Sequence, residues 1–274
     1  MSDTHDELSI FPLELRTIRK TYRNGKSALH DVSITINRGE IIGLLGLNGA
    51  GKSTTLKVLA TILKPTSGSF TVGPRRSDVS TLTESELLAL KQKLAWFPER
   101  PLLYNMLTAR EYIRFVGRLI GIERVELGRR IEELLNSLRL LDAADDFIRT
   151  YSYGMQRKVS LAACMINNPD LLLLDEPTSG IDPEGIQVLE DIIRTAQKQN
   201  RSVILSTHVL ETAGRLCDHI VILHEGRSCF TGSVAELRSE LMAPSNATLK
   251  DLFLDLVRQR EEAELPSGVQ QKKI

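Results

Sequence analysis

The sequence has no excess of charge of either sign, and this absence disfavours a large class of partners. Its 274 residues include 35 Lys and Arg residues and 35 Asp and Glu residues, so the formal net charge is zero. Proteins that mainly bind nucleic acid usually carry a basic excess, because they neutralise phosphates. We therefore expect no nucleic acid as the main partner, while a local basic patch stays compatible with this composition.

Cysteine and long apolar segments are scarce as well. The three cysteines, Cys164, Cys217 and Cys229, lie far apart. No pair has metal-ligand spacing, and an odd number does not make a disulfide framework, so we expect three reduced thiols, as in cytosolic proteins. Uncharged stretches such as residues 41–51 and 159–169 are shorter than the roughly 20 residues that a membrane-spanning helix needs.

The first residues give no signal for secretion. They carry Asp3, Asp6 and Glu7 and no apolar run, unlike a signal peptide. The sequence therefore predicts a protein that is neither secreted nor membrane-spanning. A place at the cytoplasmic side of the cell membrane would depend on a separate membrane subunit.

Apolar residues, at 42% of the chain, are sufficient for a sizeable core. Residues 13–22 and 28–36 alternate apolar and polar side chains around Asn24-Gly25, which predicts an antiparallel strand pair. Short continuous apolar runs follow and predict buried strands at residues 41–45, 94–97, 171–174, 202–206 and 219–223. Helical patterns separate these runs, so we predict an α/β fold with a mostly parallel sheet and antiparallel strands at its front.

One segment interrupts the alternation of strands and helices. Residues 98–160 contain only helical patterns, and we interpret them as a helical subdomain inserted into a core formed by residues 13–97 and 161–260. Residues 1–12 are expected to form a tail, and the polar residues 261–274 a disordered one. Capping boxes predict helix starts after Thr83, Thr108 and Ser233.

A glycine-rich motif follows the predicted strand at residues 41–45. It fits the pattern G-x-x-x-x-G-K-[ST] and consists of Gly46, Leu47, Asn48, Gly49, Ala50, Gly51, Lys52 and Ser53. Between a buried strand and a helix, such a loop turns its backbone N–H groups toward a triphosphate. Lys52 would reach the β- and γ-phosphates, Ser53 would hold Mg²⁺, and the helix N-terminus would add partial positive charge.

Two acidic residues follow the apolar strand at residues 171–174. Ligands of open α/β sheets bind at the carboxyl ends of the strands, where Asp175 would contact Mg²⁺ and Glu176 would polarise the attacking water. Taken alone, a strand that ends in a solvated acidic turn is an equally good interpretation. The phosphate loop in the same chain favours the catalytic one.

Two further groups of polar residues extend this hypothesis. His208 closes the strand at residues 202–206 and, as a neutral imidazole, would hydrogen-bond the γ-phosphate and the water. Ser152 and Gly154 stand where another helix begins, and a hydroxyl with a glycine N–H there can bind an anion. An ordinary N-cap on an amphipathic helix explains Ser152 equally well.

The order of these motifs resembles the nucleotide-binding subunits of ATP-binding cassette (ABC) transporters, from about residue 13 to residue 258. Residues 46–53 resemble the Walker A loop, residues 171–176 resemble Walker B with its catalytic Glu, and residues 179–182 resemble the D-loop. By the same resemblance His208 is the switch histidine, Tyr22 stacks on adenine, and Thr54 extends the set of ATP-binding residues. Residues 152–156 resemble the signature motif that defines this superfamily.

The signature departs from the usual Leu-Ser-Gly-Gly-Gln, because Tyr151, Tyr153 and Met155 replace three of its residues. Ser152 and Gly154, which supply the phosphate contacts, remain. Glu99 stands where the family has a metal-contacting Gln. Both departures resemble the stand-alone ATPases that are paired with ABC-2-type exporters; drift in an importer ATPase is the alternative.

The resemblance implies an ATPase that uses ATP and Mg²⁺ and powers a separate transmembrane permease. Since ATP in this family lies between the phosphate loop of one protomer and the signature of the other, it also implies a homodimer or a pair with a related ATPase. Residues 100–107 follow Glu99 directly and carry apolar side chains in a predicted loop, so we expect them to dock a cytoplasmic helix of the permease. The alternative is that they pack under the helical subdomain, with Leu103 and Leu107 the residues most suited to the core. The alternatives are a soluble ABC ATPase outside transport and a module that binds ATP without cleaving it.

Overall fold

The computed structural model describes residues 9–264, and across them the chain forms one ten-stranded sheet. The strands are β1 (Leu13–Thr21), β2 (Ser27–Ile36), β3 (Ile41–Leu45), β4 (Ser67–Val72), β5 (Ser77–Asp78), β6 (Leu94–Phe97), β7 (Leu171–Asp175), β8 (Ser202–Thr207), β9 (His219–His224) and β10 (Arg227–Gly232). Their order across the sheet is β5-β4-β1-β2-β10-β9-β3-β8-β7-β6.

The centre of the sheet is parallel, as the sequence predicts. Strand β3 pairs in parallel with β8 and β9, and β7 pairs in parallel with β6 and β8. Every residue of β3 and β7 is buried, because helices cover both faces of a parallel sheet. The continuous apolar runs of the sequence are therefore the innermost strands.

The antiparallel front strands are also present. Strand β1 pairs with β2 and with β4, and Leu15 lies opposite both Ile34 and Phe70. The sequence pattern does not predict strands β4, β5 and β10, because they are short and carry mainly polar or glycine residues. β10 joins β2 at a single register pair, Arg227 with Asp31, so the front strands form a nearly separate part of the sheet.

Helices surround this sheet in the described part of the chain. They are α1 (Lys52–Leu59), α2 (Glu84–Gln92), α3 (Ala109–Leu119), α4 (Arg124–Ser137), α5 (Tyr153–Met165), α6 (Pro183–Lys198), α7 (Leu210–Leu216), α8 (Val234–Glu240) and α9 (Leu249–Glu264). All three predicted capping boxes form, at Thr83, Thr108 and Ser233. Helix α1 ends at Leu59, and Thr61 then adopts a left-handed backbone with φ of 56°.

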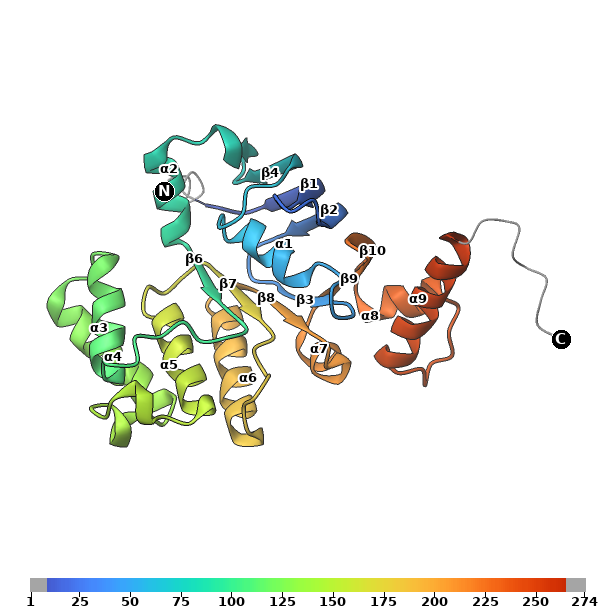
Figure 1. Cartoon of the computed structure of the whole chain (residues 1–274). Coiled ribbons are helices and arrows are strands. Elements are labelled where there is room, and N and C mark those ends of the chain that lie inside the picture. Colours follow the sequence, from blue (N-terminus) through green and yellow to red (C-terminus); the bar gives the residue numbers. More distant parts are fainter. Residues whose placement is uncertain (1–8, 265–274) are drawn as a thin grey trace, which may run out of the picture.

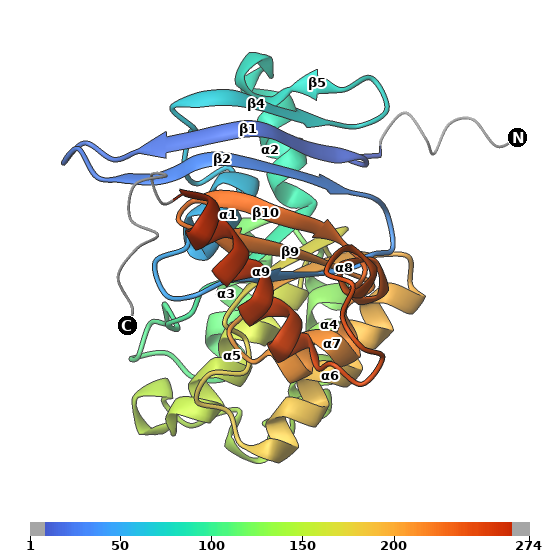
Figure 2. The same cartoon turned by 90° about the vertical axis from the view of Figure 1, so that its right-hand side faces the viewer.

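The arrangement of the helices places α1 between the two parts of the sheet (Figure 1), where it contacts both β2 and β7. Helices α3 and α4 lie together at one end of the molecule, and α9 lies at the other end against α7 and α8 (Figures 1 and 2). The end formed by α3 and α4 corresponds to the segment that we interpret from the sequence as a helical subdomain. Its expected boundary after residue 160 falls inside α5, which contacts both α3 and β6.

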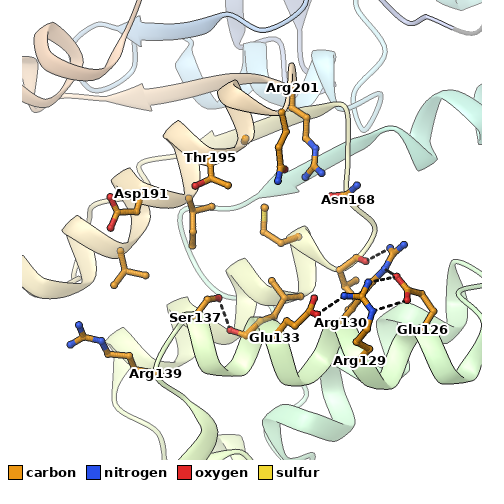
Figure 3. A pocket seen from close by; sticks show the side chains of 17 residues that line it. Glu126, Arg129, Arg130, Glu133, Ser137, Arg139, Asn168, Asp191, Thr195 and Arg201 are labelled. Carbon is orange, nitrogen blue, oxygen red and sulfur yellow. Dashed lines mark hydrogen bonds and ion pairs between the residues drawn. The ribbon is translucent and has the colours of Figure 1, made fainter. Parts of the chain in front are cut away.

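A cleft of about 650 Å³ lies where the helical segment meets the core, between α4 and α6. Figure 3 shows its charged side chains, among them the Glu126 carboxylate, which pairs with Arg129 and Arg130 on the same helix. Arg201 reaches into the cleft from the opposite wall. No glycine-rich loop lines this cleft, so the phosphate-binding motif of the sequence lies elsewhere.

The two predicted tails need correction at their inner ends. Ile10 and Phe11 are buried in the core around β1 and β2 rather than free. Helix α9 continues to Glu264, so residues 261–264 do not begin a tail. Residues 1–8 and 265–274 lie outside the described part. Within residues 9–264 no helix combines the length and the apolar character that crossing a membrane requires.

Candidate nucleotide-binding site

The glycine-rich loop joins the buried strand β3 to helix α1. Gly49 and Gly51 have φ values of 86° and 105°, a region that residues with a side chain rarely adopt. A Cβ at Gly51 would lie 2.6 Å from Leu29 Cδ2, so the front strands also require a glycine here. Gly51 caps α1 without a side-chain hydrogen bond, and the first N–H groups of the helix are thus directed toward the loop.

Lys52 is the first residue of α1, and its side chain returns into the loop. The residue is only 6% exposed, and its Nζ donates to Gly46 O at 2.8 Å. The same Nζ lies 3.5 Å from Glu176 Oε1. A buried ammonium next to a carboxylate and the loop is suited to an anionic ligand, because its charge is only partly compensated in a low-dielectric environment.

Hydroxyl and carboxylate oxygens meet where β7 and β8 end. Ser53 Oγ donates to Asp175 Oδ1 at 3.0 Å, and Ser206 Oγ donates to the same oxygen at 2.7 Å. Ser206 Oγ also accepts from Glu176 N at 3.0 Å. Asp175 and Ser206 are paired across β7 and β8, so the sheet register fixes this network.

Glu176 follows β7 with a left-handed backbone, φ of 45°, which turns its side chain toward the loop. Its two carboxylate oxygens have different partners. Oε1 faces Lys52, and Oε2 lies 2.8 Å from Nδ1 of His208. The side chain of His208 is largely exposed, whereas that of Glu176 is nearly buried. A carboxylate held between a lysine and a histidine is fixed in orientation at the edge of solvent.

A cavity of about 480 Å³ collects most of the residues that the sequence singles out. It is lined by ten of them: Tyr22, Asn48, Gly49, Gly51, Lys52, Ser53, Thr54, Glu99, Glu176 and His208. Tyr22 is tied to the loop by a hydrogen bond of 3.1 Å between its hydroxyl and Thr54 Oγ1. Sequence reasoning missed Lys26, Ser27 and Ala28, which also line the cavity and carry no motif that identifies them. Ser179, the first residue of the segment that resembles the D-loop, lines the cavity as well.

Other predicted residues lie outside that cavity. Gly46, Leu47 and Ala50 belong to the glycine-rich loop but do not line the cavity. Asp175 is buried next to Ser53. Ser152 and Gly154 stand apart, at the start of α5. Ser152 is exposed, and its Oγ caps the helix by accepting from Met155 N at 3.3 Å. The structure therefore does not bring the signature residues together with the loop of the same chain.

Arg157 is a site residue that sequence reasoning missed. Its side chain is completely buried and lies over the ring of Phe97 at 4.1 Å. It donates to the carbonyl oxygens of Pro98 and Glu99 and, at 2.8 Å, to that of Glu176. Burial lowers the pKa of the Arg157 guanidinium. Its sequence neighbours, Gln156 and Lys158, are polar and charged, so no pattern in the sequence marks Arg157 as buried.

The parallel sheet, the glycine-rich loop before α1 and the acidic end of β7 define a nucleotide-binding protein of the P-loop class. Comparison with known proteins gives the family: the model for the ABC transporter family matches residues 29–179. The chain belongs to this family and is an ABC-type ATPase, the ATP-binding subunit of a transporter.

Curated relatives cover most of the chain. NatA, an ABC transporter ATP-binding protein of Bacillus subtilis, is 34% identical over 77% of this chain and 83% of its own length. The daunorubicin/doxorubicin resistance ATP-binding protein DrrA of Streptomyces peucetius is also 34% identical, over 92% of this chain and 73% of its own length. The linearmycin resistance ATP-binding protein LnrL of B. subtilis is similar to the same degree.

Solved structures agree with the fold. The ATP-binding subunit of an ABC transporter has a TM-score of 0.81 and 32% identity, covering 90% of this chain and 99% of its own. A dimeric post-hydrolysis structure of an ATP-binding cassette, bound to ADP and phosphate, has a TM-score of 0.73 and 25% identity, covering 81% and 98%. The predicted α/β fold with parallel core and antiparallel front strands is thus confirmed.

Proposed function

We propose that this chain hydrolyses ATP with Mg²⁺ at the cavity beside its phosphate loop, and that it drives a separate export permease as part of a dimer. The observation that carries the proposal is the contact of Glu176 with both Lys52 and His208 at that cavity. A cation for phosphate, a carboxylate for water and an imidazole beside it are the groups that phosphoryl transfer to water requires.

ATP binding is assigned to the loop from Gly46 to Thr54 and to Tyr22. The N–H groups of the loop and the N-terminus of α1 would bind the phosphates, and Lys52 would exchange its contact with Gly46 O for phosphate oxygens. Tyr22 lies at the edge of the same cavity, where its ring can stack on the base.

Water activation is assigned to Glu176 and His208. The carboxylate Oε2 that contacts His208 is on the side away from Lys52, so a water hydrogen-bonded to it would be held by His208 as well. Glu176 would take the proton as this water attacks the γ-phosphate. Lys52 on the other oxygen restricts the rotation of the carboxylate.

The residues present fit Mg²⁺ held jointly with the phosphates. No group of three or more His, Cys, Asp and Glu side chains within residues 9–264 forms a metal site. The Ser53 hydroxyl and the Asp175 carboxylate instead meet at 3.0 Å beside the loop, and Glu99 lines the same cavity. A few hard oxygen ligands suit Mg²⁺, which keeps its waters and the substrate phosphates as its remaining ligands. When bound, it would neutralise phosphate charge.

The positions of Ser152 and Gly154 support the proposal of a dimer. Both are at the N-terminus of α5 and outside the cavity that Lys52 and Glu176 line. They can serve a nucleotide only if it is bound to a second ATPase subunit, either another copy or a related chain. Each site would then combine the loop of one subunit with α5 of the other.

The variant Glu176→Gln tests the hydrolytic function. It leaves Lys52 and Ser53, the groups proposed to bind phosphate and Mg²⁺, in place but removes the base, so we expect ATP to bind while phosphate release falls by at least ~100-fold. Gel filtration with ATP should then reveal a trapped dimer. Glu211→Gln, which changes an exposed carboxylate on α7, is the control. Unchanged phosphate release in Glu176→Gln would refute the role of Glu176.

An apolar groove is assigned to the permease. It has a volume of about 390 Å³ and lies between α2 and α3, with Leu88, Leu102 and Leu119 on its walls. The segment at residues 100–107 exposes Leu102, Tyr104 and Met106, whereas Leu103 and Leu107 are half-buried. An apolar surface of this kind marks an interface. The segment follows Glu99 directly, so an amphipathic cytoplasmic helix of the permease would bind next to a residue of the nucleotide cavity.

The double variant Leu102→Ser, Tyr104→Ser tests this surface. Both side chains are exposed, so the subunit should fold and keep its basal ATPase activity. Recovery of the subunit with its permease in co-purification should fall several-fold. Leu254→Ser, which changes an exposed leucine on α9 at the other end of the molecule, should leave recovery unchanged. Wild-type recovery of the double variant would place the docking surface elsewhere.

Export rather than import is supported by the relatives. Two of them are resistance proteins for daunorubicin/doxorubicin and for linearmycin, and both departures from the usual family motifs, at Glu99 and at Tyr151 to Met155, resemble the exporter branch. ATP-dependent loss of a compound from cells that express this chain with its permease would establish the direction.

A further inference from the structure

Tyr153, the first residue of α5, contacts two loops of its own chain. Its hydroxyl donates to Glu99 O at 3.2 Å. Its ring covers Gly180, where a Cβ would lie 2.5 Å from Tyr153 Cε1. Gly180 has a φ of 69° and belongs to the loop between β7 and α6. Tyr153 therefore links the loop after β6 to the loop after β7 through one side chain.

Arg157 strengthens the same link one turn further along α5. It donates to Glu99 O, which also accepts from Tyr153, and to Glu176 O. Since Arg157 is completely buried, α5 cannot shift without moving these carbonyl groups. Glu99 and Glu176 line the nucleotide cavity, so the start of α5 is connected to both walls of that cavity.

We propose that Tyr153 is a positioning residue that transmits nucleotide binding at its own subunit's cavity to Ser152, the adjacent residue at the start of α5. This inference rests on the proposed composite sites, in which Ser152 serves the nucleotide of the other subunit. ATP that moves Glu99 or the Ser179–Gly180 segment would displace the Tyr153 side chain and with it the turn that carries Ser152. The two sites of a dimer would then bind ATP cooperatively.

The exposure of Tyr153 distinguishes this role from core packing. Tyr153 is 44% exposed, whereas Tyr151 is 6% exposed and donates its hydroxyl to Ala143 O inside the helical segment. Truncation of Tyr153 should therefore leave the fold intact. The matched control is Tyr151→Phe. This variant removes a similar hydrogen bond from a tyrosine hydroxyl to a carbonyl oxygen two residues away, but the Tyr151 side chain contacts neither Glu99 nor Gly180.

Hydrogen exchange at protein concentrations where the subunit is monomeric tests the link within one chain. We expect ATP to slow exchange in residues 151–156 of the wild type by ~3–10-fold, the equivalent of one ordinary hydrogen bond. Tyr153→Ala should abolish this effect, Tyr153→Phe should retain part of it through the ring, and Tyr151→Phe should keep it. The affinity for ATP should be unchanged in Tyr153→Ala, because its side chain does not line the cavity.

Steady-state kinetics test the consequence in the dimer. We expect the Hill coefficient for ATP to exceed 1 in the wild type and to fall toward 1 in Tyr153→Ala. ATP-dependent protection of residues 151–156 that persists in Tyr153→Ala would overturn the inference. If the protection depends on Tyr153 but Glu176→Gln stays monomeric with ATP, the composite sites fail and the link within the chain stands.

Discussion

Replacing Ser206 by Ala tests whether this residue positions the proposed catalytic groups in addition to stabilising the fold. Ser206 is completely buried in β8. Its hydroxyl donates to Asp175 Oδ1 at 2.7 Å and accepts from Glu176 N at 3.0 Å. The variant removes both hydrogen bonds without removing any group proposed to touch ATP.

The size of the effect follows from these two partners. A hydrogen bond to a charged group contributes about 1.5–3 kcal/mol, and a buried N–H left without an acceptor costs about 1–3 kcal/mol. The sum, about 2.5–6 kcal/mol, is a large fraction of the ~5–15 kcal/mol by which a domain is stable. Since Glu176 N also loses the contact that holds its left-handed backbone, we expect kcat to fall by ~10–100-fold, with a smaller change in KM.

Ser202→Ala is the matched control on the same strand. Ser202 is equally buried, donates to Asn37 O at 2.8 Å and accepts from Gly39 N at 2.9 Å, but neither partner lies at the nucleotide cavity. Urea unfolding followed by circular dichroism should show a loss of stability in both variants, and phosphate release should fall only in Ser206→Ala. If kcat is unchanged in both, Ser206 does not position Glu176; an unchanged stability of Ser206→Ala would refute the hydrogen-bond network.

Three further predictions concern single side chains. Lys52→Ala should weaken binding of a fluorescent ATP analogue by roughly 10–100-fold, since a charge-assisted contact is lost; wild-type affinity would exclude Lys52 from the site. Ser152→Arg should bind ATP but lose turnover, and mixing it with Lys52→Ala should restore part of the activity, because one site of a mixed dimer has both halves intact; full activity of Ser152→Arg alone would contradict composite sites. Burial raises the pKa of the Cys164 and Cys217 thiols to about 12, so iodoacetamide at pH 8 should modify these two thiols much more slowly in the folded protein than in the unfolded one, and equal labelling rates would contradict the raised pKa values.

The sequence alone predicts those structural features that depend on residues close to one another in the chain. The apolar run of β3 and the loop that follows form one continuous segment, and the capping boxes at Thr83, Thr108 and Ser233 each involve residues three apart. Hydrophobic periodicity and local hydrogen bonding determine such features. The assignments of Lys52, Glu176 and the other site residues to ATP and Mg²⁺ remain predictions that the variants above test.

Contacts between distant segments could not be predicted. Nothing in the motif around Ser152 indicates that Tyr153 reaches Glu99 or that Arg157 reaches Glu176. The role of Ser206 depends on which residue of β7 lies opposite it. These contacts arise from strand order and helix packing, which pattern analysis does not specify residue by residue.

The shared register of the central strands limits where the chain can accept inserted residues. Asp175 is paired with Ser206, and Leu45 with Thr207, so the carboxyl ends of β3, β7 and β8 finish in step. One residue inserted into any of these strands would move its end by ~3.3 Å and turn its side chains to the other face. Insertions into the loops that precede β7 and β8 enter at the opposite edge and leave these pairings in place. A library of insertions should therefore yield active proteins when the insertion lies in these loops and inactive proteins when it lies within β3, β7 or β8.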